Sequence, residues 1–401
     1  MSKFDVVALG ELLIDFSKKG VGLTGNPVFE ANPGGAPCNV LSMLGHLGKK
    51  TTFLGKVGKD FLGDFLADTL KEQGIDTTNL SRDENVPTTL AFVDNAPDGD
   101  RSFSFYRNPG ADMMLREEDI DFSVLDSSSI FHFGTLSLTD SGIEQTTKTA
   151  VQYAKNKGLL ISFDPNLRPP LWKDLNRAKD MMAYGMSVCD ILKISDNEIE
   201  FFTGTDDIEE GIEILKEQYH PTLICATMGK EGSIALYKKH KVKCEAFLQE
   251  RTVDTTGAGD TFMACILNHV LELGIENLNE SNLKHMLVFA NAAASIITTR
   301  IGALKAMPTR SEVETFLLSK NVNEVNEVKL KLNTIDKIKE FVSIISSFEG
   351  EFLIKSERYV IDAKSIMGIF SLDLSKPLLL DIEATPATME EILDAIREYV
   401  V

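Results

Sequence analysis

Alternation of short apolar strands with amphipathic helices constrains the fold of this chain most. Helical patterns such as Phe61–Gln73 and Gly142–Lys157 separate runs rich in β-branched and aromatic residues. The runs are Phe4–Gly10, Thr52–Val57, Ile130–Phe133, Leu159–Phe163, Ile191–Ile194 and Leu223–Thr227. Strands that alternate with helices of about ten or more residues form a parallel sheet covered on both faces. The pattern therefore predicts a doubly wound α/β domain.

Two stretches, 18–33 and 88–106, interrupt this alternation. In the second, the alternating β formers Thr88–Val93 and Arg101–Tyr106 flank the turn-rich Asp94–Asp100. Turns rich in Pro, Asp and Gly between such runs are typical of a β-hairpin. We expect these stretches to form a small β lid that stands off the main sheet.

A second domain is expected at the C-terminal end. A helix at about Arg310–Leu318 precedes the polar stretch 319–327, which has few apolar anchors and is typical of a linker. The predicted organisation is therefore a domain over 1–318, a linker over 319–327 and a compact α+β domain over 328–401. Its expected elements are a strand Val328–Leu332, a helix Asp336–Phe348, a hairpin Phe352–Ile361, a helix Ser365–Leu372, a strand Leu378–Glu383 and a helix Met389–Val401.

Charge and composition exclude several classes of function. The 401 residues carry a net charge of -19, which argues against sequence-independent binding to nucleic acid or to an anionic membrane. The start has no signal segment, and no apolar run approaches the roughly 20 residues that span a bilayer. We therefore expect a cytoplasmic protein. The 5 cysteines are scattered, and the 6 histidines include no pair at helical metal-site spacing, so a disulfide framework and a transition-metal centre are both disfavoured.

The segment Gly257–Asp260 carries the strongest chemical signal. It comes directly before the helical pattern Thr261–Leu273, and small residues at a helix N-terminus let backbone N–H groups hold an anion. A carboxylate at such a place is repulsive to phosphate unless it accepts a proton from the attacking hydroxyl. The alternative is a helix cap, because Asp and Gly are common there.

The wider segment Asp254–Phe262 resembles the C-terminal signature of the ribokinase-like, or PfkB, carbohydrate kinases. Pro33–Asn39 is similar to the N-terminal Gly-Gly motif of the same family. The resemblance implies an ATP-dependent sugar kinase with Asp260 as the catalytic base. It assigns the backbone amides of Gly257, Ala258 and Gly259 to the transferring phosphoryl group. On the sugar side it implies contacts from Asp15, Gly34, Gly35 and Asn39.

Further positions match the nucleotide side of the family. Thr227–Gly232 is similar to the turn that approaches the phosphates and ribose, which implies roles for Thr227, Gly229 and Gly232. Asn291 matches a position beside the adenine, although a polar helix residue would explain it equally well. A Mg²⁺ ion is implied by ATP chemistry.

Two acidic residues match the metal positions of the family. Glu198 fits an Asn-x-x-Glu element that organises Mg²⁺ through water, but Ser195 stands where the family has asparagine. Asp254 matches a residue near a monovalent-cation site, which implies K⁺ activation.

Three segments point to the sugar: Gly10–Phe16, Phe103–Asp112 and Phe163–Trp172 resemble bacterial fructokinases. They predict that D-fructose is converted to fructose 6-phosphate. Arg107 and Arg168 would supply cations over the sugar and the phosphate, unless they form surface ion pairs. A 2-keto-3-deoxygluconate kinase shares much of this pattern, and a non-catalytic sugar-responsive regulator is a further alternative. Exposed lid strands favour a homodimer.

The segment Tyr359–Leu372 resembles the second half of the HPr phosphocarrier proteins. All 6 histidines precede residue 286, so this HPr-like domain has no histidine that could carry phosphate. Ser365 matches a serine that is phosphorylated in some HPr proteins, but serine is also a good helix N-cap. A protein partner for the domain is expected.

Overall fold

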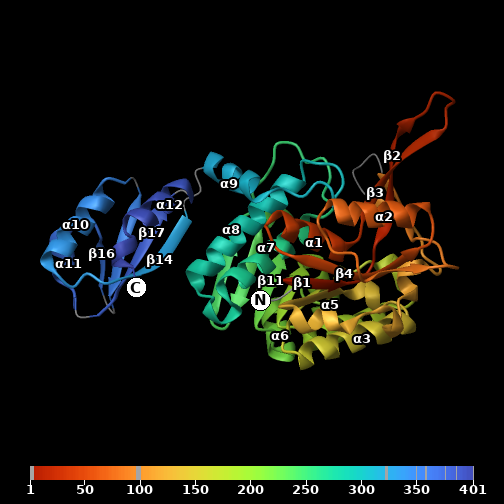
Figure 1. Ribbon diagram of the computed structural model, residues 1–401, viewed down its shortest axis with the longest axis horizontal. Coiled ribbons are helices and arrows are strands. Elements are labelled where there is room, and N and C mark those ends of the chain that lie inside the picture. Colours follow the sequence, from red (N-terminus) through yellow and green to blue (C-terminus); the bar gives the residue numbers. More distant parts are fainter. Residues whose placement is uncertain are drawn as a thin grey trace. The chain divides into compact units, whose positions relative to one another are not determined.

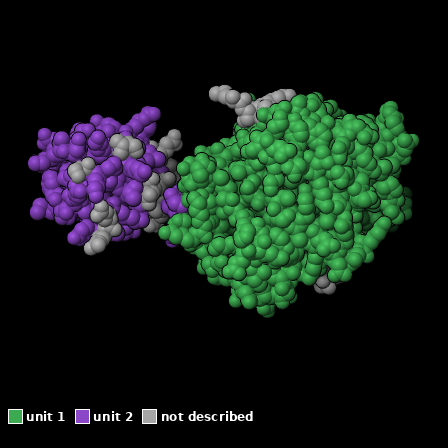
Figure 2. Space-filling view, turned by 90° about the horizontal axis from the view of Figure 1, so that it is seen from below, with its two compact units in different colours: residues 1–278, 286–310 green, residues 279–285, 311–401 purple. Residues whose placement is uncertain are grey.

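The computed structural model describes residues 4–95, 101–320, 324–348, 350–356, 359–374, 376–384 and 386–400. The chain divides into two compact units, coloured separately in Figure 2: residues 1–278 with 286–310, and residues 279–285 with 311–401. The helix α9 (Arg310–Ser319) thus falls almost wholly in the second unit. The domain limits expected from the sequence stay a proposal.

A large mixed sheet forms the centre of the first unit. Its order is β13-β12-β11-β10-β9-β8-β1-β4-β5. The strands are β1 (Val6–Leu9), β4 (Thr51–Gly58), β5 (Leu80–Asp83), β8 (Ile130–Gly134), β9 (Leu160–Asp164), β10 (Ile191–Ser195), β11 (Leu223–Thr227), β12 (Ser233–Tyr237) and β13 (His240–Cys244). The strands from β11 to β5 pair in parallel, as predicted. The antiparallel strands β12 and β13 were not predicted.

Helices cover both faces of this sheet (Figure 1). They are α1 (Ala36–His46), α2 (Phe61–Glu72), α3 (Ser141–Asn156), α4 (Leu175–Val188), α5 (Asp196–Thr203), α6 (Ile208–Tyr219), α7 (Ala258–Leu273) and α8 (Glu280–Ile297). In Figure 1, α1 and α7 lie on one face, and α3, α5 and α6 lie on the other. The apolar runs of the strands are buried between these layers, which explains why they lack polar alternation.

The order of the strands reverses direction at β1. From β1 the chain first builds outward through β4 and β5, and it later builds the other way through β8, β9, β10 and β11. In open α/β sheets, ligands bind beyond the carboxyl ends of the strands at such a switch point. The fold therefore singles out the loops that follow β1, β8, β9 and β10.

The predicted lid is a separate four-stranded sheet of order β3-β2-β6-β7. Its strands are β2 (Leu13–Val21), β3 (Pro27–Gly34), β6 (Leu90–Asn95) and β7 (Arg101–Tyr106). The β2–β3 hairpin projects from the main sheet in Figure 1. Rings of Phe16 and Phe92 stack with centroids 5.0 Å apart, so aromatic cross-strand pairs hold the lid strands together. Residues 96–100 of the predicted turn lie outside the described residues.

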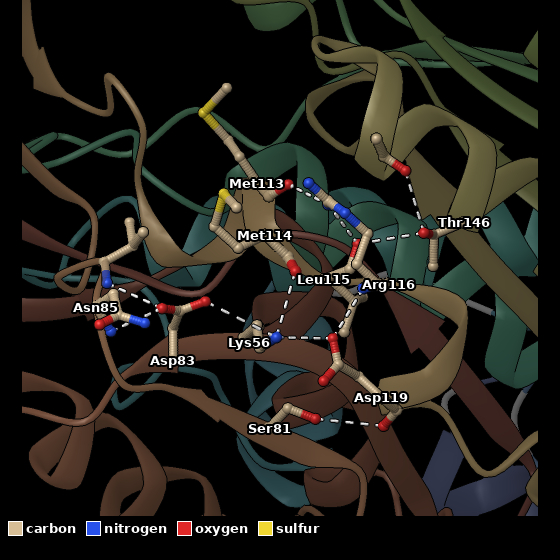
Figure 3. Close-up of polar contacts among 12 residues, drawn as sticks. Lys56, Ser81, Asp83, Asn85, Met113, Met114, Leu115, Arg116, Asp119 and Thr146 are labelled. Carbon is tan, nitrogen blue, oxygen red and sulfur yellow. Dashed lines mark hydrogen bonds and ion pairs between the residues drawn. The ribbon is translucent and has the colours of Figure 1, made fainter.

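A polar network anchors the chain where it returns from the lid (Figure 3). Lys56 Nζ, on β4, lies 2.7 Å from Asp119 Oδ2 and 3.8 Å from Asp83 Oδ2. The same ammonium donates to the carbonyl of Met114. Arg116 donates through its guanidinium to the Met113 carbonyl at 2.9 Å. These contacts fasten the segment after β7 to β4 and to the edge strand β5.

The second unit contains a four-stranded antiparallel sheet of order β14-β17-β15-β16. Its elements are β14 (Glu324–Leu330), α10 (Ile335–Ser346), β15 (Glu351–Ser356), β16 (Tyr359–Asp362), α11 (Ile366–Ile369), β17 (Leu378–Ala384) and α12 (Pro386–Ala395). This is the predicted order of elements, although β14 begins inside the expected linker. The core is formed by Leu330, Ile338, Phe341, Ile354, Leu380 and Tyr399. The unit therefore has its own apolar interior.

In the part of the chain that the structure describes, no helix has the length and apolar character needed to cross a membrane.

Candidate active site

Two cavities lie at the carboxyl ends of the sheet strands and share residues at their border. One, of about 380 Å³, is lined by residues that include Asp15, Asn39 and Asp260. The other, of about 450 Å³, is lined by Thr227, Gly229, Gly232, Asn291 and further residues. Thr255 and Gly259 line both. A group bound in one cavity can therefore approach a group bound in the other across the turn that begins α7.

The border turn is built as the sequence predicts. Gly257 precedes α7 with φ 81°, a left-handed conformation that glycine adopts without strain. The first intrahelical hydrogen bond runs from Thr261 N–H to Gly257 O at 2.8 Å. Amide groups ahead of that bond have no acceptor within the helix. The Ala258 amide donates to the Thr255 carbonyl at 3.3 Å. The amides of Gly257, Gly259 and Asp260 are therefore the ones in this turn that an anion can use.

Asp260 lies in the first turn of α7 with only 8% of its surface exposed. Its Oδ2 accepts a hydrogen bond of 2.7 Å from Asn39 Nδ2, so the α1 and α7 helices meet at this carboxylate. Burial raises the pKa of Asp260, while the Asn39 amide and the cations Lys193 and Arg168 oppose that rise. A carboxylate with a raised pKa is a better proton acceptor than one exposed to water.

Asn39 has one polar atom left over. Its Nδ2 donates to Asp260, whereas its Oδ1 is buried and has no hydrogen-bond partner among the described residues. Leaving a buried oxygen unpaired costs about 1–3 kcal/mol. Asn39 itself lines the smaller cavity, beside the carboxylate of Asp260 to which it donates.

The paired glycines allow the lid and the sheet to meet at this cavity. A Cβ atom at Gly34 would lie 2.5 Å from Asp15 Oδ2, and one at Gly35 would collide with the Glu11 carbonyl. Gly35 also has φ 135°, which side chains rarely adopt. Larger residues would displace Asp15 from the cavity wall. Burial raises the pKa of Asp15 to about 6, and Arg168 opposes this rise.

The two predicted arginines have different surroundings. Arg168 is half-buried and lines the same cavity as Asp15. Arg107 lines neither cavity: its Nε donates to Asp112 Oδ2 at 2.8 Å, and its Nη2 donates to the Leu136 carbonyl at 2.9 Å. Leu136 itself lines the cavity. The structure thus places Arg107 behind the wall, where it braces Leu136, and a direct contact with substrate stays a prediction.

The larger cavity holds the predicted nucleotide residues. Thr227 ends β11, and Gly229 and Gly232 have φ 52° and φ 93° in the turn that follows. Asn291 lies in the wall with its amide already paired, since Nδ2 donates to the Glu245 carbonyl at 3.0 Å and Oδ1 accepts from Ser233 at 2.9 Å. The geometry makes Asn291 a brace for this wall. Its contact with adenine stays a prediction.

The predicted metal residues are engaged by protein groups. Glu198 Oε1 accepts from Leu167 N–H at 2.8 Å, and its Oε2 accepts from the Ser195 amide at 2.8 Å, forming a capping box for α5. Asp254 accepts from the amides of Thr256 at 2.8 Å and Gly302 at 3.3 Å. Among the residues that the structure describes, no group of three His, Cys, Asp or Glu side chains could hold a metal. The residues therefore do not form a metal cage by themselves.

Three buried charged residues beside the cavity were not predicted. Lys193 on β10 pairs with Asp164 at the end of β9, with Nζ 3.1 Å from Oδ2. Glu11, after β1, accepts from the Ala36 amide at 2.8 Å, and burial raises its pKa to about 7. For Asp164, which ends β9, and Glu11, which follows β1, the available signal was position at the carboxyl end of a strand beside the switch point, where ligands bind. Lys193 lies in the middle of β10 and gave no such signal.

In the second unit, Ser365 is exposed and lies at the N-cap of α11. Its Oγ accepts a hydrogen bond of 3.2 Å from the Gly368 amide. The structure thus shows the capping role. Phosphorylation of the same hydroxyl stays a prediction.

Comparisons with known proteins agree with this geometry. A family model described as "pfkB family carbohydrate kinase" matches residues 3–310, and one described as "PTS HPr component phosphorylation site" matches residues 336–401. Fructokinase-2 of Solanum lycopersicum is 39% identical over 316 residues, which cover 78% of this chain and 95% of that protein. The probable fructokinase-3 of Arabidopsis thaliana is 38% identical over 325 residues, 80% of this chain and 93% of that protein.

Solved structures are similar over the same part of the chain. The fructokinase of Xylella fastidiosa with bound ATP matches with a TM-score of 0.72 and 30% identity, covering 79% of this chain and 98% of that one. A double mutant of the Vibrio cholerae O395 fructokinase, with bound fructose, ADP and potassium ion, matches with a TM-score of 0.70 and 27% identity, covering 79% of this chain and 99% of that one.

Proposed function

This chain belongs to the pfkB family of carbohydrate kinases, and on that premise we propose that it transfers the terminal phosphoryl group of ATP to D-fructose, forming fructose 6-phosphate. Its solved relatives confirm the predicted ribokinase-like α/β fold. The observation that carries the proposal is the meeting of two cavities at Gly259, with the buried carboxylate of Asp260 on one side of that border.

In this proposal ATP occupies the cavity lined by Thr227 and Asn291, and the sugar occupies the cavity lined by Asp15 and Asn39. Asp15 accepts hydrogen bonds from sugar hydroxyls, and Asn39 contacts the sugar from the same cavity wall. Holding both reactants at a common border turns a reaction between two molecules into one within a single complex.

Asp260 accepts the proton of the attacking hydroxyl. The hydrogen bond from Asn39 fixes the carboxylate, so Oδ1 remains to face the substrate. The amides of Gly257 and Gly259 stabilise the charge that develops on the phosphoryl oxygens. Closure of the β lid excludes water, which limits wasteful hydrolysis of ATP.

Metal ions enter the proposal only with the substrate. Mg²⁺ is bound mainly by phosphate oxygens and water in such sites, so MgATP is the substrate and no protein cage is required. Glu198 would contact this ion through water, because both its oxygens already accept protein hydrogen bonds. Activation by K⁺ near Asp254 is the weaker part of the proposal, since that carboxylate also accepts two amides.

Fructose is preferred over the alternatives because the similar proteins named above are fructokinases. A 2-keto-3-deoxygluconate kinase would need a cation for the substrate carboxylate; Arg168 lines this cavity, but Asp15 places a negative charge in the same cavity, which disfavours an anionic sugar. A regulator without catalysis would not require a buried base at the border of the two cavities.

We further propose that the protein is cytoplasmic, that it forms a homodimer and that its HPr-like unit binds a protein partner. All 5 cysteines are buried and none forms a disulfide in the described residues, which fits the reducing cytoplasm. A homodimer through the lids is supported by the exposure of Val21 and Phe29, which are 69% and 40% exposed. A protein partner for the HPr-like unit is supported by its exposed apolar residues Met367 and Tyr359.

A coupled assay of ADP release tests the substrate directly. Full-length protein is supplied with MgATP and fructose, 2-keto-3-deoxygluconate, ribose or a nucleoside. We expect fructose to give the highest kcat/KM, and ³¹P NMR of the product to show phosphate at the 6-position. Turnover with 2-keto-3-deoxygluconate alone would transfer the assignment to that sugar acid. No turnover with any acceptor would favour the regulator.

Replacing the base tests the mechanism. Asp260→Asn keeps the shape of the side chain but cannot accept a proton at neutral pH. We expect kcat to fall by about 10²–10⁴-fold while ATP affinity, measured by calorimetry, changes little. Near-normal turnover in this variant would rule out Asp260 as the base.

The decrease of kcat/KM at low pH, the acid limb of the rate profile, should follow the protonation of the carboxylates in the site. Asp260 works only when ionised, and burial raises its pKa, so kcat/KM falls as the pH decreases through that raised pKa.

Arg168 lowers the pKa of both Asp15 and Asp260. Arg168→Met should therefore move the acid limb to higher pH. The control Arg177→Met, which removes an exposed arginine paired with Glu144, should leave the limb in place. A limb that stays or moves to lower pH in Arg168→Met would contradict the assignment.

Phosphorylation of Ser365 can be checked by mass mapping after incubation with an HPr-type serine kinase and ATP. Because the hydroxyl is exposed, we expect modification at this residue. The variant Ser365→Ala should abolish it. An unmodified Ser365 beside a fully modified HPr protein in the same tube would dismiss the idea.

A further inference from the structure

A buried lysine lies at the border of the two cavities. Lys193 is the third residue of β10, and its side chain is only 8% exposed. It lines the smaller cavity together with Gly259 and Asp260. Its Nζ would be 3.0 Å from a Cβ atom added at Gly259, so the ammonium group lies against the first turn of α7.

Lys193 has unused hydrogen-bonding capacity. An ammonium group has three N–H donors. Asp164 is its one partner among the described residues, at 3.3 Å for Oδ1 and 3.1 Å for Oδ2. Asp164 itself is 3% exposed and also accepts the Asn166 amide, so its position is fixed. At least one donor of Lys193 is therefore available on the side of the cavity.

The charges around Lys193 keep it protonated. Burial disfavours the ammonium, but the carboxylates of Asp164, Glu198 and Asp260 outweigh burial and raise the pKa of Lys193. Burial likewise raises the pKa of Asp164 to about 7, against the pull of Lys193. One buried cation thus faces several acidic groups. Lys193 is therefore the counter-charge that an incoming phosphate would meet on this side of the cavity, among carboxylates that would otherwise repel it.

We propose that Lys193 is a further catalytic residue, whose ammonium, held by Asp164, contacts the phosphoryl group as it passes from the nucleotide cavity to the sugar cavity. The inference rests on the proposed function and adds to it the cation that the transfer requires. A fixed ammonium in a water-excluded site stabilises the charge on the phosphoryl oxygens and costs no rearrangement during the reaction.

The step balances without any change to the lysine. The bond between the sugar oxygen and the γ-phosphorus forms, and the bond between that phosphorus and the bridging oxygen of ATP breaks. The electron pair of the broken bond stays with ADP, and the hydroxyl proton passes to Asp260. Lys193 keeps its protons throughout. Its charge also opposes the rise that burial causes in the pKa of Asp260 and so favours the ionised form that accepts this proton.

The competing explanation is an ion pair that only stabilises the fold. Lys56 provides a matched control, because it is also a lysine on a strand of the same sheet, 11% exposed at its side chain and paired with Asp119 at 2.7 Å (Figure 3). It lines neither cavity. Loss of either lysine leaves an uncompensated buried carboxylate, so both variants should be destabilised.

The experiment compares Lys193→Met with Lys56→Met in kcat and in nucleotide affinity. For Lys193→Met we expect kcat to fall by about 10²–10³-fold. Calorimetry should show an affinity for the non-hydrolysable analogue AMP-PNP reduced by about 10-fold, with the affinity for ADP nearly unchanged, since only the first carries a γ-phosphate. Lys56→Met should lower the melting temperature but leave kcat and both affinities near those of the unchanged protein.

A double variant separates the two explanations even if Lys193→Met is unstable. Asp164→Asn with Lys193→Met removes both charges and keeps an oxygen for the Asn166 amide. We expect it to regain thermal stability without regaining kcat or AMP-PNP affinity. The proposal would be overturned if the double variant recovered both kcat and AMP-PNP affinity. It would also be overturned if Lys193→Met bound AMP-PNP and turned over normally. If the unchanged protein phosphorylates no sugar, the proposed function fails, but the comparison of AMP-PNP with ADP still tests the contact.

Discussion

The hydrogen bond between Asn39 and Asp260 joins the two parts of the sequence on which the site depends. It is 2.7 Å long and connects residues 221 positions apart. Asn39 follows the glycine turn between the lid and α1, and Asp260 follows the glycine turn before α7. Because the bond fixes one oxygen of Asp260, the orientation of the other oxygen is fixed too. The position of the cavity lined by Asp15 relative to the cavity lined by Thr227 depends on this contact.

Local cations are needed in the site to offset its buried carboxylates. The chain carries a net charge of -19, yet the proposed reaction brings a nucleotide phosphate beside buried carboxylates. Such a site is workable only if cations are placed among those carboxylates. Arg168 lines the same cavity as Asp15, and Lys193 lies between Asp164 and the α7 turn. The overall acidity therefore makes the few local cations more important.

Much of the fold could be predicted because the strands that are buried on both faces read as apolar runs. The hairpin β12–β13 could not, since its turn contains Lys238 at φ 53° in place of the glycine or asparagine that usually marks such a turn. For the site, Asp260, Asn39 and Asp15 were found through short motifs, and the structure gathers them around one cavity. Lys193 was missed because a lone lysine in an apolar strand gives no spacing signal. Arg107 lies behind the wall because Asp112, five residues later, pairs with it.

The most direct measurement is a crystal structure of the full-length protein with fructose and AMP-PNP bound together. The 6-hydroxyl oxygen should lie within about 2.6–3.2 Å of an Asp260 oxygen, on the line of attack to the γ-phosphorus, with a γ-phosphate oxygen at hydrogen-bond distance from Lys193 Nζ. A closed complex in which fructose lies elsewhere, or in which Asp260 faces away from the 6-hydroxyl, would contradict the assignment of Asp260 as the base between the two cavities.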